Sequence, residues 1–185
     1  MSNFLWNVWL SFLDRTDFTV AGITGASVFY TRSAAAAYYT AGAIFCSLSV
    51  KVIKRLVKQP RPPPTARKLK KTYGMPSTHS AAISYLATYI VLASMFLPVH
   101  PSFPPSINIR LLAPVVALPW AVAVVMSRLW LGHHTVPQVL AGASYGVALA
   151  SVWFSIWKNV LSPSETVRGF EKEVVKMVEH YLTMS

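Results

Sequence analysis

Residues 127–157 read SRLWLGHHTVPQVLAGASYGVALASVWFSIW, a short polar stretch followed by a largely apolar run. The apolar part, Pro137 to Trp157, has the length of about 20 residues that an α-helix needs to cross a bilayer. Pro137 suits the first turn of such a helix, because proline lacks the N–H that would be unpaired there. The polar part places an arginine and two histidines just before this helix. The stretch therefore predicts a membrane-spanning helix with reactive side chains at its start.

Four further apolar runs occur along the chain. They cover Phe18 to Thr31, Ser33 to Ile53, Thr78 to Leu97, and Leu111 to Met126, the last extendable to Leu131. Of the 185 residues, 54% are hydrophobic and 12% are charged, about half the charged share of a soluble domain. This composition, with a mean hydropathy of +0.44, excludes an ordinary soluble protein and a disordered chain. We predict an all-α integral membrane helical bundle of about five transmembrane helices, with four to six possible because Phe18 to Thr31 is short.

The chain divides into three parts. Residues 1–17 form an N-terminal segment in which FLWNVWLSFL is too short to cross a bilayer and has the Trp and Phe content of an interfacial helix. Residues 18–161 form the membrane domain, and residues 162–185 have the pattern of an amphipathic tail. If five helices cross, the N-terminus and the loops 54–77 and 127–136 share one membrane face.

The charges are distributed unevenly. The net charge is +11, and the six acids are Asp14, Asp17, Glu165, Glu171, Glu173 and Glu179. No carboxylate occurs between Phe18 and Ser164, which excludes a carboxylate acid–base pair and disfavours a site for Mg²⁺ or Ca²⁺ in the membrane domain. The lone Cys46 provides no cysteine zinc site and is expected to be buried. We therefore predict no metal and no cofactor, and a middle region that attracts anions.

Three polar blocks lie at the ends of the apolar runs: Lys54 to Pro62, Gly74 to Ser80 and Ser127 to Gln138. Basic side chains suited to an anion gather in the first and the third. Arginine offers a planar fork of donors to phosphate oxygens and lysine a compact positive charge. Lys54, Arg61 and Arg128 are thus expected to clamp a polyanion. The basic loop lacks a nucleic-acid reader motif and adjoins membrane spans, so no nucleic-acid partner is predicted.

Two histidines flank this predicted anion site. In the block Gly74 to Ser80, Ser77 is a plausible N-cap, which puts His79 in the first turn of a helix. Gln138 follows His134 by four residues, so its amide oxygen is within reach of a ring nitrogen. A histidine pair in a cationic setting favours phosphoryl transfer, with one ring as nucleophile and the other as proton donor.

The three blocks resemble the tripartite signature of the type 2 phosphatidic acid phosphatase superfamily, KxxxxxxRP, PSGH and SRxxxxxHxxxD. The matching residues are Lys54, Arg61 and Pro62, then Pro76, Ser77 and His79, then Ser127, Arg128 and His134. Thr78 stands in place of the glycine and Gln138 in place of the aspartate. The strings KRLVKQPRP, YGMPSTHS and HTVPQVLAG are most similar to the dolichyl diphosphatase branch, which also has this glutamine.

The resemblance implies a metal-independent lipid diphosphate phosphatase that converts dolichyl diphosphate into dolichyl phosphate and inorganic phosphate. It implies that His134 attacks phosphorus and forms a phosphohistidine, and that His79 protonates the leaving oxygen. The phosphoryl oxygens would be held by Lys54, Arg61, Ser77 and Arg128. Gln138 would orient His134, with Thr78, His133 and Thr135 as supporting residues.

Two alternatives stay open. One is a phosphatase of another lipid phosphate, such as phosphatidate, a sphingoid phosphate or a shorter isoprenoid diphosphate. The other is a non-catalytic lipid-binding relative, which only the exchange of aspartate for Gln138 supports.

The resemblance implies the endoplasmic reticulum membrane, a role in dolichol recycling for protein N-glycosylation, and an active site on the lumenal face. The positive-inside rule instead favours the cytosol for that face, because its loops carry the most Lys and Arg. Since many of these charges are expected to serve phosphate binding, we predict the lumenal orientation. The sequence predicts no particular oligomeric state.

Overall fold

The computed structural model describes residues 2–63, 72–99 and 107–162, together with Gly169, Glu173 and Lys176. Every regular element in this part of the chain is a helix, which confirms the predicted all-α class. The elements are α1 (Ser2–Asp14), α2 (Thr16–Thr31), α3 (Ala34–Val57), α5 (Thr78–Phe96), α6 (Ile107–Trp130) and α7 (Val136–Ile156), which continues into a π-helical turn, η1 (Trp157–Leu161). Apart from Ser162, Gly169, Glu173 and Lys176, the predicted tail lies outside the described residues.

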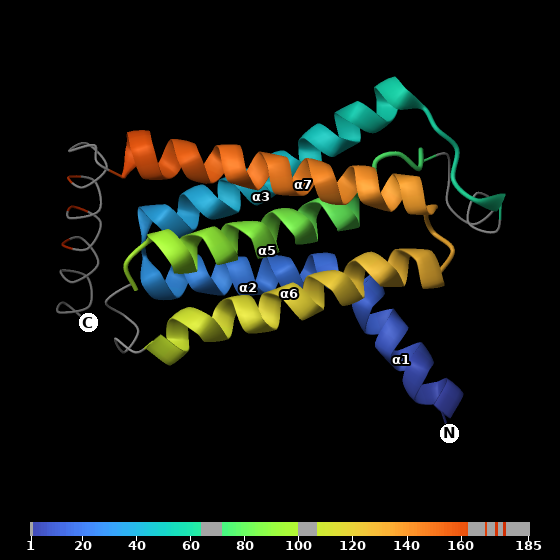
Figure 1. Cartoon of the computed structure of the whole chain (residues 1–185), viewed down its shortest axis with the longest axis horizontal. Coiled ribbons are helices and arrows are strands. Elements are labelled where there is room, and N and C mark those ends of the chain that lie inside the picture. Colours follow the sequence, from blue (N-terminus) through green and yellow to red (C-terminus); the bar gives the residue numbers. More distant parts are fainter. Residues whose placement is uncertain are drawn as a thin grey trace.

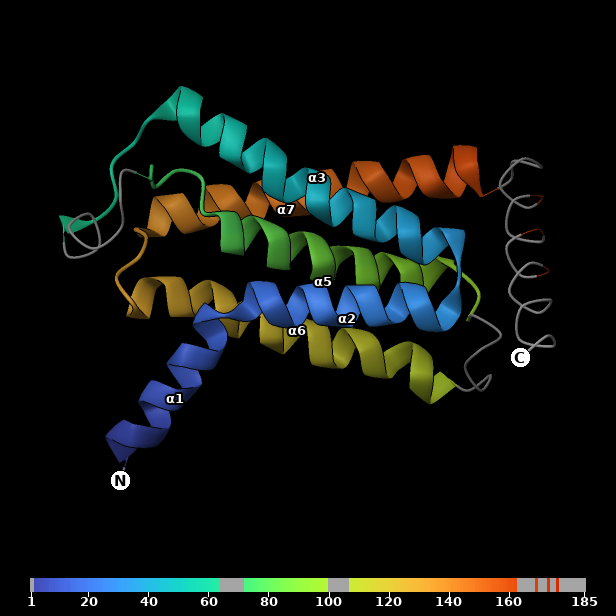
Figure 2. The same ribbon diagram turned by 180° about the vertical axis from the view of Figure 1, so that it is seen from behind.

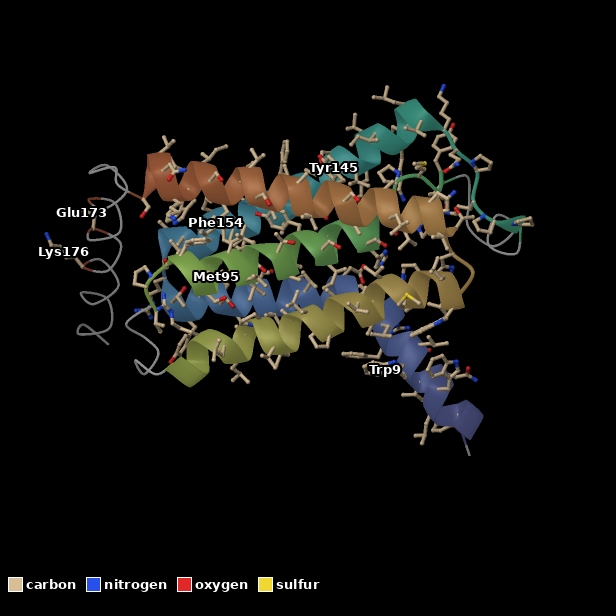
Figure 3. The ribbon with its side chains drawn as sticks, viewed as in Figure 1. Trp9, Met95, Tyr145, Phe154, Glu173 and Lys176 are labelled. Atoms are coloured by element: carbon tan, nitrogen blue, oxygen red, sulfur yellow. The ribbon has the colours of Figure 1, made fainter. Side chains whose placement is uncertain are left out.

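Helix α5 occupies the centre of the bundle. It packs against α3, α6 and α7, while α2 runs beside α3 and α1 diverges from the bundle at one end (Figures 1 and 2). Figure 3 shows Phe154 of α7 directed toward α5, where its ring lies 5.4 Å from that of Tyr89. Cys46 of α3 is fully buried, as expected for a small apolar side chain.

Four helical segments of the described chain are long and apolar enough to cross a membrane: Ala34–Val57, Thr78–Phe96, Arg110–Trp130 and Val136–Leu161. They make the protein a multi-pass membrane protein. With its 16 residues, α2 is about 24 Å long, shorter than a hydrocarbon core of about 30 Å. The structure thus meets the lower end of the predicted range of four to six, and crossing by α2 stays a prediction.

The contact between α5 and α7 depends on two glycines one turn apart. A Cβ atom on Gly146 would collide with the backbone oxygen of Ala81, and one on Gly142 with the backbone oxygen of Ser77. The two helices therefore approach at backbone distance, as small residues allow between membrane helices. This contact sets the position of α7 along its axis relative to the first turns of α5.

Replacing Gly146 by alanine should destabilise the bundle, because the added methyl meets a backbone atom that cannot rotate away. The expected cost is about 1–3 kcal/mol, typical of overpacking, measured as a lower midpoint of thermal unfolding in detergent. Gly22→Ala in α2 is the matched control, since nothing lies within 4 Å of the added atom. There alanine should be neutral or stabilising by up to about 1 kcal/mol, through helix propensity. Equal effects at the two sites would contradict the close-contact explanation.

Candidate functional site

The three polar blocks meet at one end of the bundle, where the loop after α3, the start of α5 and the link from α6 to α7 lie together (Figure 1). Gln138 Nε2 donates to the Pro60 carbonyl at 2.9 Å, and Arg61 Nη1 donates to the His133 carbonyl at 3.3 Å. The Ser77 N–H donates to the Gln138 carbonyl at 3.0 Å. These bonds join each of the first two blocks to the third.

The ring of His134 lies between Gln138 and Arg61. Its Nδ1 is 3.2 Å from Gln138 Oε1, the contact predicted from the four-residue spacing, and its Nε2 is 3.4 Å from Arg61 Nη1. A guanidinium can only donate, so Nε2 must be the acceptor and Nδ1 must carry the proton. His134 therefore presents the lone pair of Nε2 toward a guanidinium that is itself suited to hold an anion.

The amide of Gln138 is fixed from both ends. Its Nε2 donates to the Pro60 carbonyl and, at 3.1 Å, to Gln59 Oε1. Its Oε1 accepts from the Thr135 N–H at 3.3 Å as well as from His134. A carboxylate at this position could serve His134 but could not donate to Pro60. These contacts explain why a glutamine suits position 138: its side chain both orients His134 and holds the first polar block in place.

Electrostatics keep His134 neutral. Burial, followed by the positive charges of Arg61 and Lys54, lowers the pKa of His134 to about 3, while its contacts with Gln138 and Gly74 act in the opposite direction. The ring is therefore neutral at pH 7, with the proton on Nδ1 and the lone pair of Nε2 directed at Arg61. Burial and the nearby positive charge of Arg128 also lower the pKa of Arg61.

Ser77 and His79 begin α5 at the same place. Ser77 is fully buried and is the N-cap, accepting from the Ser80 N–H at 3.4 Å and from the Ser80 hydroxyl at 3.0 Å. His79 follows in the first turn. Its Nε2 is buried and, among the described residues, has no hydrogen-bond partner, and the same holds for Nε of Arg61. Buried polar atoms are normally paired, so two such atoms beside Lys54 and Arg128 fit a site built to receive a polar ligand.

Lys54 and Arg128 complete the cationic group. Lys54, in the last turn of α3, is 9% exposed, and Arg128, near the end of α6, is 1% exposed. Nε and Nη2 of Arg128 donate to the Ser127 hydroxyl at 3.1 and 2.9 Å. The structure thus brings together all the residues expected to bind phosphate, from four separate segments.

Thr78, His133 and Thr135, the three residues expected to support the site, differ in their surroundings. Thr135 is the N-cap of α7, and its N–H bonds to Gln138. His133 Nε2 lies 3.3 Å from Asp14 Oδ1. Thr78 is the first residue of α5 and is partly buried.

Sequence reasoning missed Asp14, at the end of α1. Its Oδ1 accepts from Arg128 Nη1 at 2.8 Å, and Arg128 Nη2 donates to the neighbouring Leu13 carbonyl at 2.9 Å. The one available signal was topological: five crossings place the N-terminus on the face that carries the polar blocks. The N-terminal segment is therefore part of the site.

We expect histidine-labelled protein to show His134 in one neutral tautomer by ¹⁵N NMR, with Nδ1 protonated and Nε2 free, from about pH 8 down to about pH 5. Arg61→Met should raise the pKa of His134 from about 3, because a neighbouring positive charge no longer disfavours the imidazolium. Burial should still hold it below its ordinary value. Titration of the wild-type ring near pH 6.5, or a proton on Nε2, would contradict the assigned geometry.

Known proteins resemble this chain at the level of sequence. A probable sphingosine-1-phosphate phosphatase of Dictyostelium discoideum is 38% identical over 106 residues, 55% of this chain and 25% of that protein. Lipid phosphate phosphatase gamma of Arabidopsis thaliana is 34% identical over 112 residues, 60% of this chain and 48% of that protein. Dolichyldiphosphatase 1 of Callithrix jacchus is 34% identical over 118 residues, again 60% of this chain and 48% of that protein. The chain spans between a quarter and a half of the length of these three relatives.

A solved structure shares the fold. The transmembrane PAP2 type phosphatidylglycerolphosphate phosphatase from Bacillus subtilis matches with a TM-score of 0.66 and 24% identity, over 85% of this chain and 77% of that one. The family model of the PAP2 superfamily matches residues 33–161, which include all three polar blocks. The chain belongs to the PAP2 superfamily.

Proposed function

We propose that this protein is a metal-independent lipid phosphate phosphatase that works through a phosphohistidine on His134. The orientation of His134 carries the proposal: its Nε2 is an acceptor 3.4 Å from Arg61 Nη1, while Nδ1 is held by Gln138. A phosphoryl group that takes over the Arg61 donor would thus lie beside the Nε2 lone pair of a neutral imidazole. The PAP2 membership of the chain and the phosphatase names of its relatives support the same reaction class.

The proposed reaction has two steps. Nε2 of His134 attacks phosphorus, forming an N–P bond as the P–O bond to the leaving group breaks. His79 supplies a proton to the leaving oxygen, which departs with the lipid. Water then attacks the phosphohistidine with His79 as base, the N–P bond breaks, and inorganic phosphate is released. His134 returns to its neutral form.

The cations stabilise the charge that develops on the transferred phosphoryl group. Lys54, Arg61 and Arg128 come from three different segments, so they can surround it from several sides. Lys54 and Arg128 are buried and Arg61 is partly buried, which reduces screening by water and strengthens their interactions with the transition state. Ser77, at the N-terminus of α5, contributes from a helix end whose free N–H groups favour an anion.

For the substrate, we propose dolichyl diphosphate. The three strings around the polar blocks support it through their similarity to the dolichyl diphosphatase branch, including the glutamine at position 138. Membrane-spanning helices beside the site suit a lipid whose long apolar tail stays in the bilayer. This substrate implies the endoplasmic reticulum membrane, a site on the lumenal face and a part in protein N-glycosylation. Residues 18–161 would then form the membrane phosphatase domain, and the N-terminal segment before it would contribute Asp14 to the site.

The first test is phosphate release from dolichyl diphosphate by the purified full chain in detergent with EDTA. We expect release in EDTA, a loss of more than about 10³-fold in His134→Ala, and acid-labile, base-stable phosphate trapped on wild-type His134 at short times. His100→Ala is the matched histidine control and should keep wild-type activity, because in the sequence His100 follows the apolar run Thr78 to Leu97, whereas His79 lies at the start of that run.

A panel of lipids separates the substrate from the reaction. Release from a sphingoid phosphate or phosphatidate, but not from dolichyl diphosphate, would retain the histidine mechanism and overturn the substrate. Release that requires a divalent metal would overturn metal independence. If the wild type releases phosphate from none of these lipids, the proposed activity is wrong and the lipid-binding alternative replaces it.

The two roles of Gln138 can be separated by substitution. Gln138→Leu removes the acceptor for His134 and the donor to Pro60, so we expect kcat to fall by about 10–100-fold, as for other residues that orient a reacting group. Gln138→Glu keeps an acceptor for His134 but loses the donor. We expect it to retain more activity than the leucine variant, with a stability loss of about 1–3 kcal/mol from the unpaired Pro60 carbonyl. Kinetics and thermal unfolding of the two variants are the measurements, and a glutamate variant as inactive as the leucine variant would contradict the division of roles.

A further inference from the structure

The guanidinium of Arg128 is nearly saturated with protein contacts. Of its five N–H groups, Nε bonds to Ser127, Nη2 to Ser127 and Leu13, and Nη1 to Asp14, at 2.8–3.1 Å. One N–H, on Nη1, is left over from these four contacts. The contacts therefore decide which donor of Arg128 can reach a phosphoryl oxygen, and two of them come from the end of α1.

The charge of Arg128 also has to be balanced. The side chain is buried beside other cations, and a buried charge is costly without an opposite one. No residue between Phe18 and Ser164 can supply a carboxylate. Asp14 does so, at 2.8 Å from Nη1.

The end of α1 is firmly attached to the bundle. Leu13 is fully buried, and its carbonyl accepts from the Thr16 hydroxyl at 2.6 Å as well as from Arg128. Trp6 contacts Trp130 with 5.3 Å between ring centroids, two residues beyond Arg128 in α6. These contacts hold the Asp14 carboxylate in place although it is 46% exposed. It is therefore a fixed part of the wall of the site.

The same carboxylate oxygen reaches the loop that carries the nucleophile. His133 Nε2 lies 3.3 Å from Asp14 Oδ1, and His133 directly precedes His134. The His133 and His134 N–H groups both donate to the Arg128 carbonyl, at 3.0 and 3.2 Å. Asp14 thus connects the side chain of Arg128 with the backbone turn that sets the position of His134.

We propose that Asp14 is a positioning residue for the phosphatase reaction: from the N-terminal helix, its carboxylate orients the Arg128 guanidinium and ties it to the turn before His134. This inference rests on the proposed function. Asp14 touches no reacting atom and acts through Arg128.

The kinetic test uses the full chain and the lipid phosphate that the wild type hydrolyses. Asp14→Ala should lower kcat/KM by about 10–100-fold, the usual range for a residue that orients another. Asp14→Asn keeps an acceptor oxygen but loses the negative charge, so its activity should lie between those of Asp14→Ala and the wild type. In an Arg128→Ala background, Asp14→Ala should cause no further loss, because the residue it positions is gone. Asp17→Ala removes an exposed carboxylate three residues away and should stay within about twofold of wild type, which controls for charge alone.

A second readout does not need turnover. In wild-type protein, the Arg128 guanidinium should give separate, slowly exchanging ¹⁵N signals because it is held at several atoms. In Asp14→Ala these signals should merge through faster rotation. The midpoint of thermal unfolding should also fall, because the buried Arg128 loses its counterion.

The outcomes separate this inference from the proposed function. Higher activity in Asp14→Ala would mean that Asp14 blocks the site, and would overturn the proposal. Unchanged activity, or an equal loss in the Arg128→Ala background, would also overturn it. Failure of the proposed function would appear as a wild type inactive on every lipid phosphate. The Arg128 signals would then decide alone, and unchanged signals in Asp14→Ala would show that Asp14 does not hold the guanidinium.

Discussion

The close approach of α5 and α7 is the constraint on which the site depends. Gly142 lies against the backbone of Ser77, and the Ser77 N–H bonds to the Gln138 carbonyl. These contacts place the N-terminus of α5 beside that of α7. His79, in the first turn of α5, and His134, two residues before α7, therefore lie at the same end of the bundle although they are far apart in the sequence. A shift of one helical turn, about 5.4 Å, would break the bond between Ser77 and Gln138.

The second constraint is electrostatic. Lys54, Arg61 and Arg128 are gathered in a partly buried region, where their mutual repulsion is poorly screened. Within the described chain, the interactions that hold them are mostly neutral: carbonyls of His133 and Leu13 and the hydroxyl of Ser127. Neutral oxygens fix the directions of Arg61 and Arg128 but leave most of the positive charge uncompensated. This arrangement suits a site whose natural counterion is a bound phosphoryl group.

Much of this could be predicted from the sequence, because it depends on local patterns. The lengths of the apolar runs predicted the helices, and a serine before an apolar run predicted the N-cap of α5. A four-residue spacing predicted the contact between Gln138 and His134. Contacts across the bundle could not be predicted, since no local rule pairs residue 14 with residue 128 or residue 60 with residue 138. The number of crossings also stayed open, because a helix the length of α2 fits either a short span or a helix beside the spans.

Gln138 and Asp14 have complementary roles in the electrostatics of the site. A carboxylate beside Nδ1 would stabilise an imidazolium and oppose the burial and cations that lower the pKa of His134 to about 3. With a neutral amide there, the tautomer is fixed while the ring stays uncharged. The negative charge lies instead at Asp14, bonded to Arg128 and His133. Gln138 thus orients the nucleophile, while Asp14 compensates the charge of the buried Arg128. Because the carboxylate contacts Arg128 and His133 rather than His134, it does not favour protonation of the His134 lone pair that would attack phosphorus.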